Sequence, residues 1–286
     1  MSAFGEQVDY RRALLFCQDY LAAEQYEDAK RCYSALLTHF GSSTATARNM
    51  LRLAQADYNQ GLDMEALARF SEVANMFPNT WVAEEAERGV ENALYRLGQR
   101  EDSAEVLSEL VDRYPTSAFA ADAQFEIATR HYEAEQYQEA ADAFRRVVSQ
   151  FPGYGSADRA QYLMADAYAR LGATAEARRG YEQFLVFFPE SDLRTTVQFR
   201  LGLQLFEEKD YMGAAVKFTA VVEQGDDAEL RPAALFNLAT AQQLLGDVHR
   251  ELDGYGERQA HVATGTTVNL RVHTNHFAIQ VKQGAT

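Results

Sequence analysis

The sequence contains only two cysteines among its 286 residues. Cys17 and Cys32 have no spacing typical of metal ligands, so a cysteine-based zinc site is not expected. Each lies in a stretch with helical periodicity, where we expect a small buried side chain. A disulfide or redox pair between the two is the alternative.

Basic residues are scarce relative to acidic ones. Lys and Arg number 27 against 42 Asp and Glu, which gives a formal net charge of −15. This excess of negative charge repels the phosphate groups of DNA and RNA. We therefore expect no nucleic-acid partner.

Long apolar runs are absent too. None approaches the ~18 residues that a transmembrane helix requires, so we expect no membrane span. The first residues lack the basic and apolar regions of a secretory signal peptide. We expect a cytoplasmic protein if the chain is complete as written, and a periplasmic or cell-envelope protein if a signal segment has been removed.

Motifs of catalysis are also missing. The sequence has no Walker loop, no metalloprotease helix and no glycine-rich turn between a strand and a helix. His273 and His276 could share a metal across a turn, but no Cys or carboxylate completes a ligand set. We expect no catalytic residue, no metal and no cofactor, and therefore no enzyme.

What the sequence does contain is a strict repeat of 37 residues. An aromatic residue recurs at this interval, and proline follows the last four of the five aromatics. A fixed period of this length indicates a solenoid of stacked helical repeats. The positions are Phe40, Phe77, Tyr114, Phe151 and Phe188, with Pro78, Pro115, Pro152 and Pro189.

Each repeat has the pattern of two helices. Gln136–Ser156 shows the second helix, whose apolar face ends at Pro152. Glycine in the turn between the helices suits a left-handed helix end. The first-helix apolar row is Phe16, Leu53, Val90, Ile127, Met164, Leu201 and Leu238. The second helix has a small residue (Ala29, Ala66, Ala140, Ala177, Ala214), then a large one (Tyr33, Phe70, Leu107, Phe144, Tyr181, Phe218). The turn glycines are Gly61, Gly98, Gly172 and Gly246.

The repeats define the expected domains. Residues 9–256 should form the solenoid, with six clear repeats and a partial seventh whose second helix, near Val248–Tyr255, is degenerate. Residues 257–286 should form a C-terminal extension, either a β-hairpin or a partly disordered segment. Two short stretches there alternate apolar and polar residues, as strands do: Val268, Leu270 and Val272, then Phe277, Ile279 and Val281.

These positions resemble the tetratricopeptide repeat (TPR) family. The family's offsets between small, large and proline positions are met by Leu53-Ala54, Ala66, Phe70 and Pro78, and again by Ile127-Ala128, Ala140, Phe144 and Pro152. The family's usual period is about 34 residues, and three more follow the proline here. The longer form, as in F-P-N-T-W-V-A-E-E-A, resembles bacterial cell-envelope TPR proteins of the Tol–Pal coordinator and β-barrel-assembly lipoprotein type.

The resemblance implies an all-α fold: a right-handed α-solenoid of TPR helix hairpins, followed by the short C-terminal hairpin. It also implies that the first helices line a concave groove. Aromatic, amide, hydroxyl and charged residues on these helices suit an extended peptide or a partner helix. The expected partner-binding residues are Arg88, Asn92, Tyr95, Phe125, Thr129, Tyr132, Arg159, Tyr162, Asp166 and Phe199.

Two qualifications apply to this site. The aromatics could instead pack only between neighbouring repeats. A complete carboxylate clamp of the TPR type is not expected, because Glu126 stands where an amide is needed; Arg88, Asn92 and Arg159 leave a partial anionic-peptide site.

The function that we expect is a protein–protein interaction scaffold that binds a protein or peptide partner in a bacterial cell-envelope complex. Two alternatives stay open: a structural assembly subunit that self-associates through its end repeats or C-terminal hairpin, and a regulatory TPR domain of a larger protein.

Overall fold

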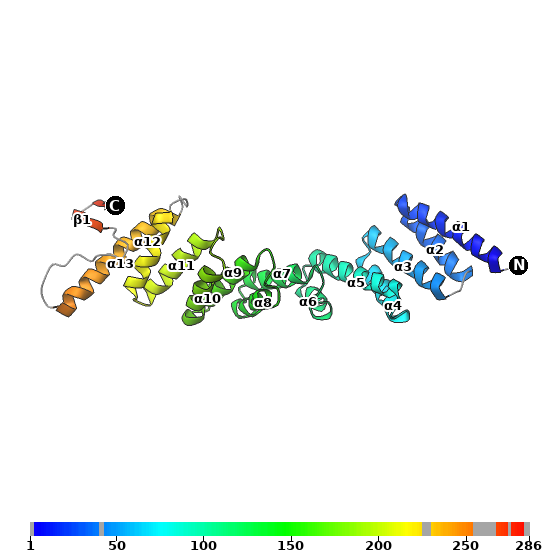
Figure 1. Cartoon of the computed structure of the whole chain (residues 1–286), viewed down its shortest axis with the longest axis horizontal. Coiled ribbons are helices and arrows are strands. Elements are labelled where there is room, and N and C mark those ends of the chain that lie inside the picture. The colour runs from blue at the N-terminus through cyan, green and yellow to red at the C-terminus, as the bar shows by residue number, and fades with distance from the viewer. Residues whose placement is uncertain (1–2, 40–42, 225–229, 254–266, 274–275, 283–286) are drawn as a thin grey trace. The chain divides into compact units, whose positions relative to one another are not determined.

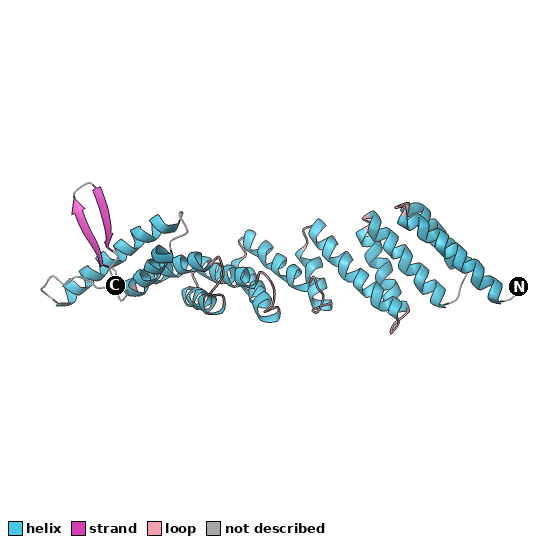
Figure 2. Cartoon of the chain, turned by 45° about the horizontal axis from the view of Figure 1, so that its top comes forward, coloured by secondary structure: helices cyan, strands magenta, loops and turns pink. Residues whose placement is uncertain are grey.

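The computed structural model describes residues 3–39, 43–224, 230–253, 267–273 and 276–282. Within these ranges the chain forms thirteen helices and two strands (Figures 1 and 2). None of the helices described combines the length and apolar character that crossing a membrane would require.

The chain divides into two compact units, Met1–Arg130 and His131–Thr286. In the first unit, the first six helices pack as consecutive neighbours, and so do the six helices that belong wholly to the second unit. The first unit contains α1 (Ala3–Ala22), α2 (Tyr26–His39), α3 (Ser43–Gln60), α4 (Asp63–Met76), α5 (Trp81–Arg100), α6 (Ala104–Arg113) and most of α7 (Ala120–Glu133). The second contains α8 (Tyr137–Gln150), α9 (Ala157–Arg170), α10 (Thr174–Phe187), α11 (Arg194–Glu207), α12 (Tyr211–Gln224) and α13 (Leu230–Asp253).

The core of each unit consists of the repeated apolar positions. Small residues of the second helices and the large residues four positions later are all buried, as are six of the seven in the first-helix row. A small residue beside a large one lets antiparallel helices interlock closely. The prediction of an all-α solenoid of helix hairpins is confirmed.

Phe16 is the exception in the first-helix row, since 57% of it is exposed. The expectation that it faces the core was wrong. Its counterpart Leu53 explains why: Leu53, on α3, packs into the core formed by α1 and α2. This row therefore faces the preceding repeat, and among the described residues no helix precedes α1.

The turns between paired helices contain a recurring left-handed residue. Gly61 and Gly172 have φ of 81° and 72°, as the glycine pattern predicted. Glu24, Glu135 and Lys209 take the same conformation at φ of 58°, 59° and 64°. The left-handed conformation therefore recurs at five places on the 37-residue interval, including three where the residue is not glycine.

The predictions for Gly98 and Gly246 were wrong, because helices continue through both positions. α5 extends to Arg100, and the left-handed residue moves to Asp102, with φ of 52°. A Cβ on Gly98 would lie 2.5 Å from Leu107 Cδ2, so this glycine allows α6 to approach α5 closely.

The seventh repeat is a single long helix in the described residues. α13 runs without interruption from Leu230 to Asp253, so a separate second helix does not begin near Val248. The helical hydrogen-bond ladder tolerates one internal glycine at a cost of about 1 kcal/mol. The expected boundary at residues 256 and 257 lies outside the described residues.

The two predicted strands are present. β1 (Thr267–His273) pairs antiparallel with β2 (His276–Lys282), with Leu270 opposite Ile279. Figure 2 shows them in magenta. The turn at residues 274–275 lies outside the described part of the chain.

The cysteines form a disulfide, so the expectation of two separate buried thiols was wrong. Cys17 on α1 and Cys32 on α2 have Cα atoms 5.4 Å apart. They meet because both sit where the two helices face each other, in or beside the core around Leu14 and Tyr33. Helical periodicity predicted their inward orientation, but their pairing depends on the register of α1 against α2.

Candidate functional site

In the first unit, the predicted residues of α5 are already engaged locally. The exposed Arg88 guanidinium pairs with Glu85, one turn earlier. Asn92 turns back on its own helix, where Nδ2 donates to the Arg88 carbonyl at 2.6 Å. Tyr95 is half-buried and stacks on Phe119, with ring centroids 4.8 Å apart. Arg88 and Asn92 thus already have partners on their own helix, and the partial anionic-peptide site of Arg88, Asn92 and Arg159 stays a prediction.

Phe125 and Thr129, on α7, are both half-buried. The Thr129 hydroxyl donates to the Phe125 carbonyl at 2.9 Å, so it satisfies its own helix. What these residues offer a partner is surface area on one helix face. Their role in binding stays a prediction.

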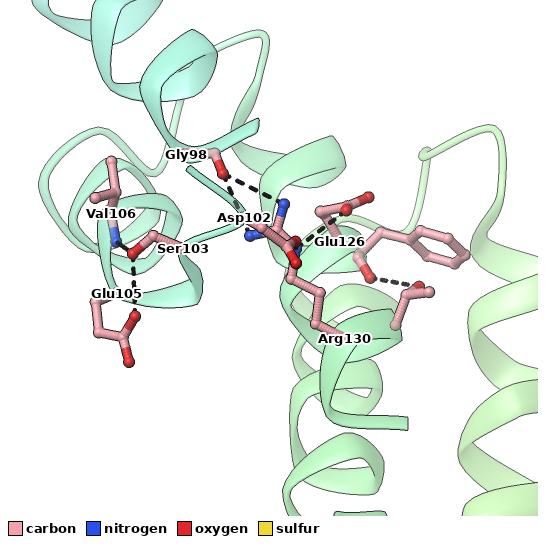
Figure 3. A network of polar contacts seen from close by, with 9 residues as sticks. Gly98, Asp102, Ser103, Glu105, Val106, Glu126 and Arg130 are labelled. Carbon is pink, nitrogen blue, oxygen red and sulfur yellow. Dashed lines mark hydrogen bonds and ion pairs between the residues drawn. The ribbon is translucent and has the colours of Figure 1, made fainter. Parts of the chain in front are cut away.

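A polar junction next to these residues was not predicted. Arg130, on α7, donates to the Gly98 carbonyl through both terminal nitrogens at 3.3 Å and pairs with Asp102 at 2.9 Å and Glu126 at 3.2 Å (Figure 3). Ser103 caps α6 by accepting from the Val106 amide. Arg130 thus satisfies a carbonyl near the end of α5 and holds the α5–α6 turn.

In the second unit, two of the residues predicted for binding, Tyr132 and Asp166, are in direct contact. Only 5% of Asp166, on α9, is exposed. Its carboxylate accepts hydrogen bonds from the Tyr132 hydroxyl of α7 and from the Tyr181 hydroxyl of α10, the latter at 3.4 Å. Arg170 Nε pairs with it at 2.8 Å, and Arg200 Nε of α11 lies 4.0 Å away. Four helices therefore meet at one buried carboxylate.

The surroundings shift the titration of both tyrosines in the same direction. Burial raises the pKa of Tyr132, and its hydrogen bond to Asp166 raises it further. Burial also raises the pKa of Tyr181, with the negative charge of Asp166 as the next cause. Both hydroxyls therefore stay protonated and remain donors across the physiological range.

Tyr162 and Phe199 are half-buried on α9 and α11. Each packs one part of its ring on an aromatic residue of a second helix: Tyr162 on Tyr181 at 6.4 Å between centroids, and Phe199 on Phe218 at 5.8 Å. Each ring therefore packs partly inside the protein, as the alternative of packing between neighbouring repeats predicted, and is also partly open to solvent. Arg159, near the start of α9, is exposed.

Three members of the Asp166 network were missed from the sequence: Arg170, Arg200 and Tyr181. One signal was available for Arg170, because a carboxylate and an arginine four residues apart face each other on a helix. Arg200 and Tyr181 come from other helices, and only the packing brings them to Asp166.

The described part of the chain contains no group of three His, Cys, Asp or Glu side chains placed to hold a metal ion. His273 and His276 lie in strands whose side chains are outside the description. The chemistry available at the Asp166 network is hydrogen bonding and charge pairing.

Comparisons with known proteins agree with this architecture. Three family models, each described as a tetratricopeptide repeat, match residues 48–80, 92–155 and 131–189. A search among curated proteins found no match.

Solved structures of repeat proteins are also similar to the chain. MamA from Desulfovibrio magneticus RS-1 is 22% identical, with 64% of this chain and 97% of that chain covered and a TM-score of 0.37. The yeast Sti1 TPR2AB domain, in a structure titled as a complex with pHSP90, is 14% identical over 82% and 99%, with a TM-score of 0.36. The Sgt2 TPR domain from Aspergillus fumigatus is 21% identical over 50% and 91%, with a TM-score of 0.39.

Proposed function

We propose that this chain, which three tetratricopeptide repeat models match over parts of its length, is a protein–protein interaction scaffold. Its partner is an extended peptide or a helix that docks on the solvent-facing side of the first helices. The observation that carries the proposal is the pair of half-buried aromatics, Tyr162 and Phe199, on successive first helices. Aromatic rings fixed on one side and open on the other supply contact area at low entropic cost.

The mechanism that we propose is docking without catalysis. Rigid rings on helices keep their positions when a partner binds, so little conformational entropy is lost. The charged groups next to them set the register of the bound segment, since an unmatched buried charge is costly. In the first unit, Phe125 and Tyr95 supply the corresponding surface.

We also propose that the protein works in the cell envelope or another oxidising compartment. The disulfide between Cys17 and Cys32 supports this proposal. Structural disulfides persist outside the cytosol and are rare inside it. The spacing of the repeats, which resembles cell-envelope TPR proteins, points the same way.

A second candidate function is self-assembly through the first repeat. Leu15 and Phe16 of α1 are both exposed, and the residues that correspond to Phe16 in the later repeats are buried. Light scattering tests it: Leu15→Ser plus Phe16→Ser should leave the mass unchanged if the protein acts as a single-chain scaffold. A fall in mass would support assembly.

The scaffold proposal is tested by quantitative affinity capture from the source cells. Phe125→Ala plus Tyr162→Ala should reduce the recovery of specific partners about tenfold or more, because truncating aromatic anchors costs 2 kcal/mol or above. The matched control is Phe187→Ala plus Met212→Ala, which removes two exposed apolar side chains from second helices.

Circular dichroism of the same variants separates binding from folding. The proposal requires that helicity and melting change little while capture is lost. A large loss of stability in Phe125→Ala plus Tyr162→Ala would show that the rings are structural, and equal capture by both pairs would contradict the first-helix surface.

A further inference from the structure

We propose that Arg170 and Arg200 form a carboxylate-binding subsite, and that the partner segment is acidic, with a Glu or Asp side chain bound between the two guanidinium groups. This inference rests on the proposed function and specifies the chemistry of its partner. It concerns residues that the sequence pattern did not single out, on two successive first helices of the second unit.

Both arginine side chains are held by neighbouring residues and are also partly exposed to solvent. Asp166 holds Arg170 Nε at 2.8 Å and lies 4.0 Å from Arg200 Nε. The Tyr162 hydroxyl is a hydrogen-bond partner of Arg200. Yet 47% of the Arg170 side chain and 45% of the Arg200 side chain remain exposed. A guanidinium fixed in this way loses little entropy when an anion binds.

The first unit offers an internal comparison. Arg96 and Arg100, on α5, also surround a buried carboxylate, that of Asp63. There Arg96 also donates to the Tyr58 carbonyl, and Arg100 donates to the Gly61 carbonyl at 2.7 Å. These carbonyls lie at the end of α3, so both guanidinium groups serve to cap a helix.

The two arginines at Asp166 differ from Arg96 and Arg100, because in the described part of the chain they do not cap a helix. Arg170 donates to Asp166 and, weakly at 3.4 Å, to the Tyr137 hydroxyl. Among the described residues, neither Arg170 nor Arg200 donates a hydrogen bond to a backbone carbonyl. A guanidinium carries five N–H donors, so each arginine retains donors for a ligand. Those donors suit a planar carboxylate, which a guanidinium can bind through two hydrogen bonds.

The local charge favours an anion although the whole chain is acidic. Two arginines against one aspartate leave a surplus positive charge at this point. The chain carries a formal charge of −15, but charges farther than about 8–10 Å are largely screened at physiological salt. A partner carboxylate is therefore attracted at this point, which helps to fix the register of a bound peptide.

The neighbouring side chains define the rest of the ligand. Phe199 precedes Arg200 in sequence, and Tyr162 stands one turn before Asp166 on α9. Both rings are partly open to solvent. An acidic residue bound by the arginines would thus place adjacent apolar residues of the partner on these rings.

Fluorescence polarisation with two labelled peptides tests the inference. One peptide consists of Glu-Phe-Gly repeats, and the other has Gln in place of every Glu. At low ionic strength, the full chain should bind the acidic peptide about tenfold more tightly or better, as charge-assisted hydrogen bonds predict. The preference should shrink at about 0.15 M salt.

Variants assign the preference to the two arginines. Arg170→Gln plus Arg200→Gln should remove it, so that both peptides bind alike. Arg113→Gln is the matched control, because Arg113 is exposed and pairs with Glu109 on its own helix. The control should keep the full preference.

Loss of Arg170 leaves a buried carboxylate short of one partner and can destabilise the fold. Arg200→Gln alone avoids this, since Arg200 lies at the outer limit of contact with Asp166; it should lower the preference at least threefold with an unchanged circular dichroism spectrum. The inference is overturned if the chain binds the two peptides equally, binds neither, or keeps its preference in Arg200→Gln. Equal binding that Phe125→Ala plus Tyr162→Ala weakens would overturn the subsite and leave the scaffold proposal standing.

Discussion

The Tyr132 hydroxyl, near the end of α7, donates a hydrogen bond to the buried carboxylate of Asp166 on α9. The bond joins the first helices of two successive repeats. Around it, Tyr132 packs against Tyr137 and Phe144 of α8, with ring centroids 5.6 and 6.4 Å away. One tyrosine thus connects three helices through a ring face and a hydroxyl.

Replacing Tyr132 by Phe should destabilise the second unit by about 1–2 kcal/mol, because a hydrogen bond to a charged, buried acceptor is lost while the ring packing stays. Chemical denaturation monitored by circular dichroism measures the change. Tyr211→Phe is the control, since Tyr211 contacts Phe206 through its ring. A loss of equal size in both variants would show that the hydroxyl of Tyr132 contributes nothing specific.

Alkaline pH should weaken the same region. The pKa values of Tyr132 and Tyr181 are raised in the folded state, so the folded chain holds these protons more tightly than the unfolded chain does. Their contribution to stability is complete below the ordinary tyrosine pKa of about 10 and is lost as pH rises through the folded values. Tyrosinate absorbance should show that these two hydroxyls ionise after the exposed tyrosines, together with unfolding. Ionisation of every tyrosine near the ordinary value, with helicity intact, would contradict the burial.

Reduction of the disulfide should loosen the first repeat selectively. The bond spans 15 residues, and a loop of this size contributes about 3 kcal/mol. Repeats depend mainly on their neighbours, so the effect should stay close to α1 and α2. Hydrogen exchange with and without reductant measures it, and Cys17→Ala plus Cys32→Ala should not respond to reductant. Uniform exchange changes along the whole chain would argue against a local role.

Gly180→Ala should destabilise the packing of α10 on α9. A Cβ at Gly180 would lie 2.8 Å from Ala165 Cβ and 3.2 Å from its Cα, so backbone must move. Overpacking of this kind costs about 1–3 kcal/mol, which exceeds the gain of up to about 1 kcal/mol in helix propensity. Gly153→Ala, which meets nothing within 4 Å, should change stability by less than about 0.5 kcal/mol. Thermal melting of the two variants decides the matter: equal melting curves would mean that α9 and α10 are not in close contact.

The local apolar pattern of the sequence predicted most of the helices, but it did not predict where some of them end. Gly61 and Gly98 share a place in the repeat, yet only Gly61 ends its helix in a left-handed turn. At Gly98 the packing of Leu107 and the arginine junction hold the helix past the glycine. These interactions come from α6 and α7, so they could not be predicted from the residues around Gly98.

The candidate site shows the same division. Tyr132, Tyr162 and Asp166 were expected from their places in the repeat, and the structure brings Tyr132 and Asp166 into contact. Arg200 was not predicted as part of the Asp166 network. Its distance from Asp166 depends on how α11 lies against α9, which only the tertiary structure shows. The sequence also placed Asn92 among the partner-binding residues; its amide donates to the Arg88 carbonyl of its own helix, and its role in binding stays a prediction.

The amino-acid sequence by itself determined the repeat length, the two-helix unit, the identity of the core positions and the two strands near the C-terminus. These follow from periodicity, since a helix or a strand aligns its apolar residues through local backbone geometry. Only the tertiary structure decided that Cys17 bonds to Cys32, that Phe16 is left uncovered and that Arg170 and Arg200 meet at Asp166. Those outcomes depend on the register between helices, which side-chain packing sets across distances that no local pattern encodes.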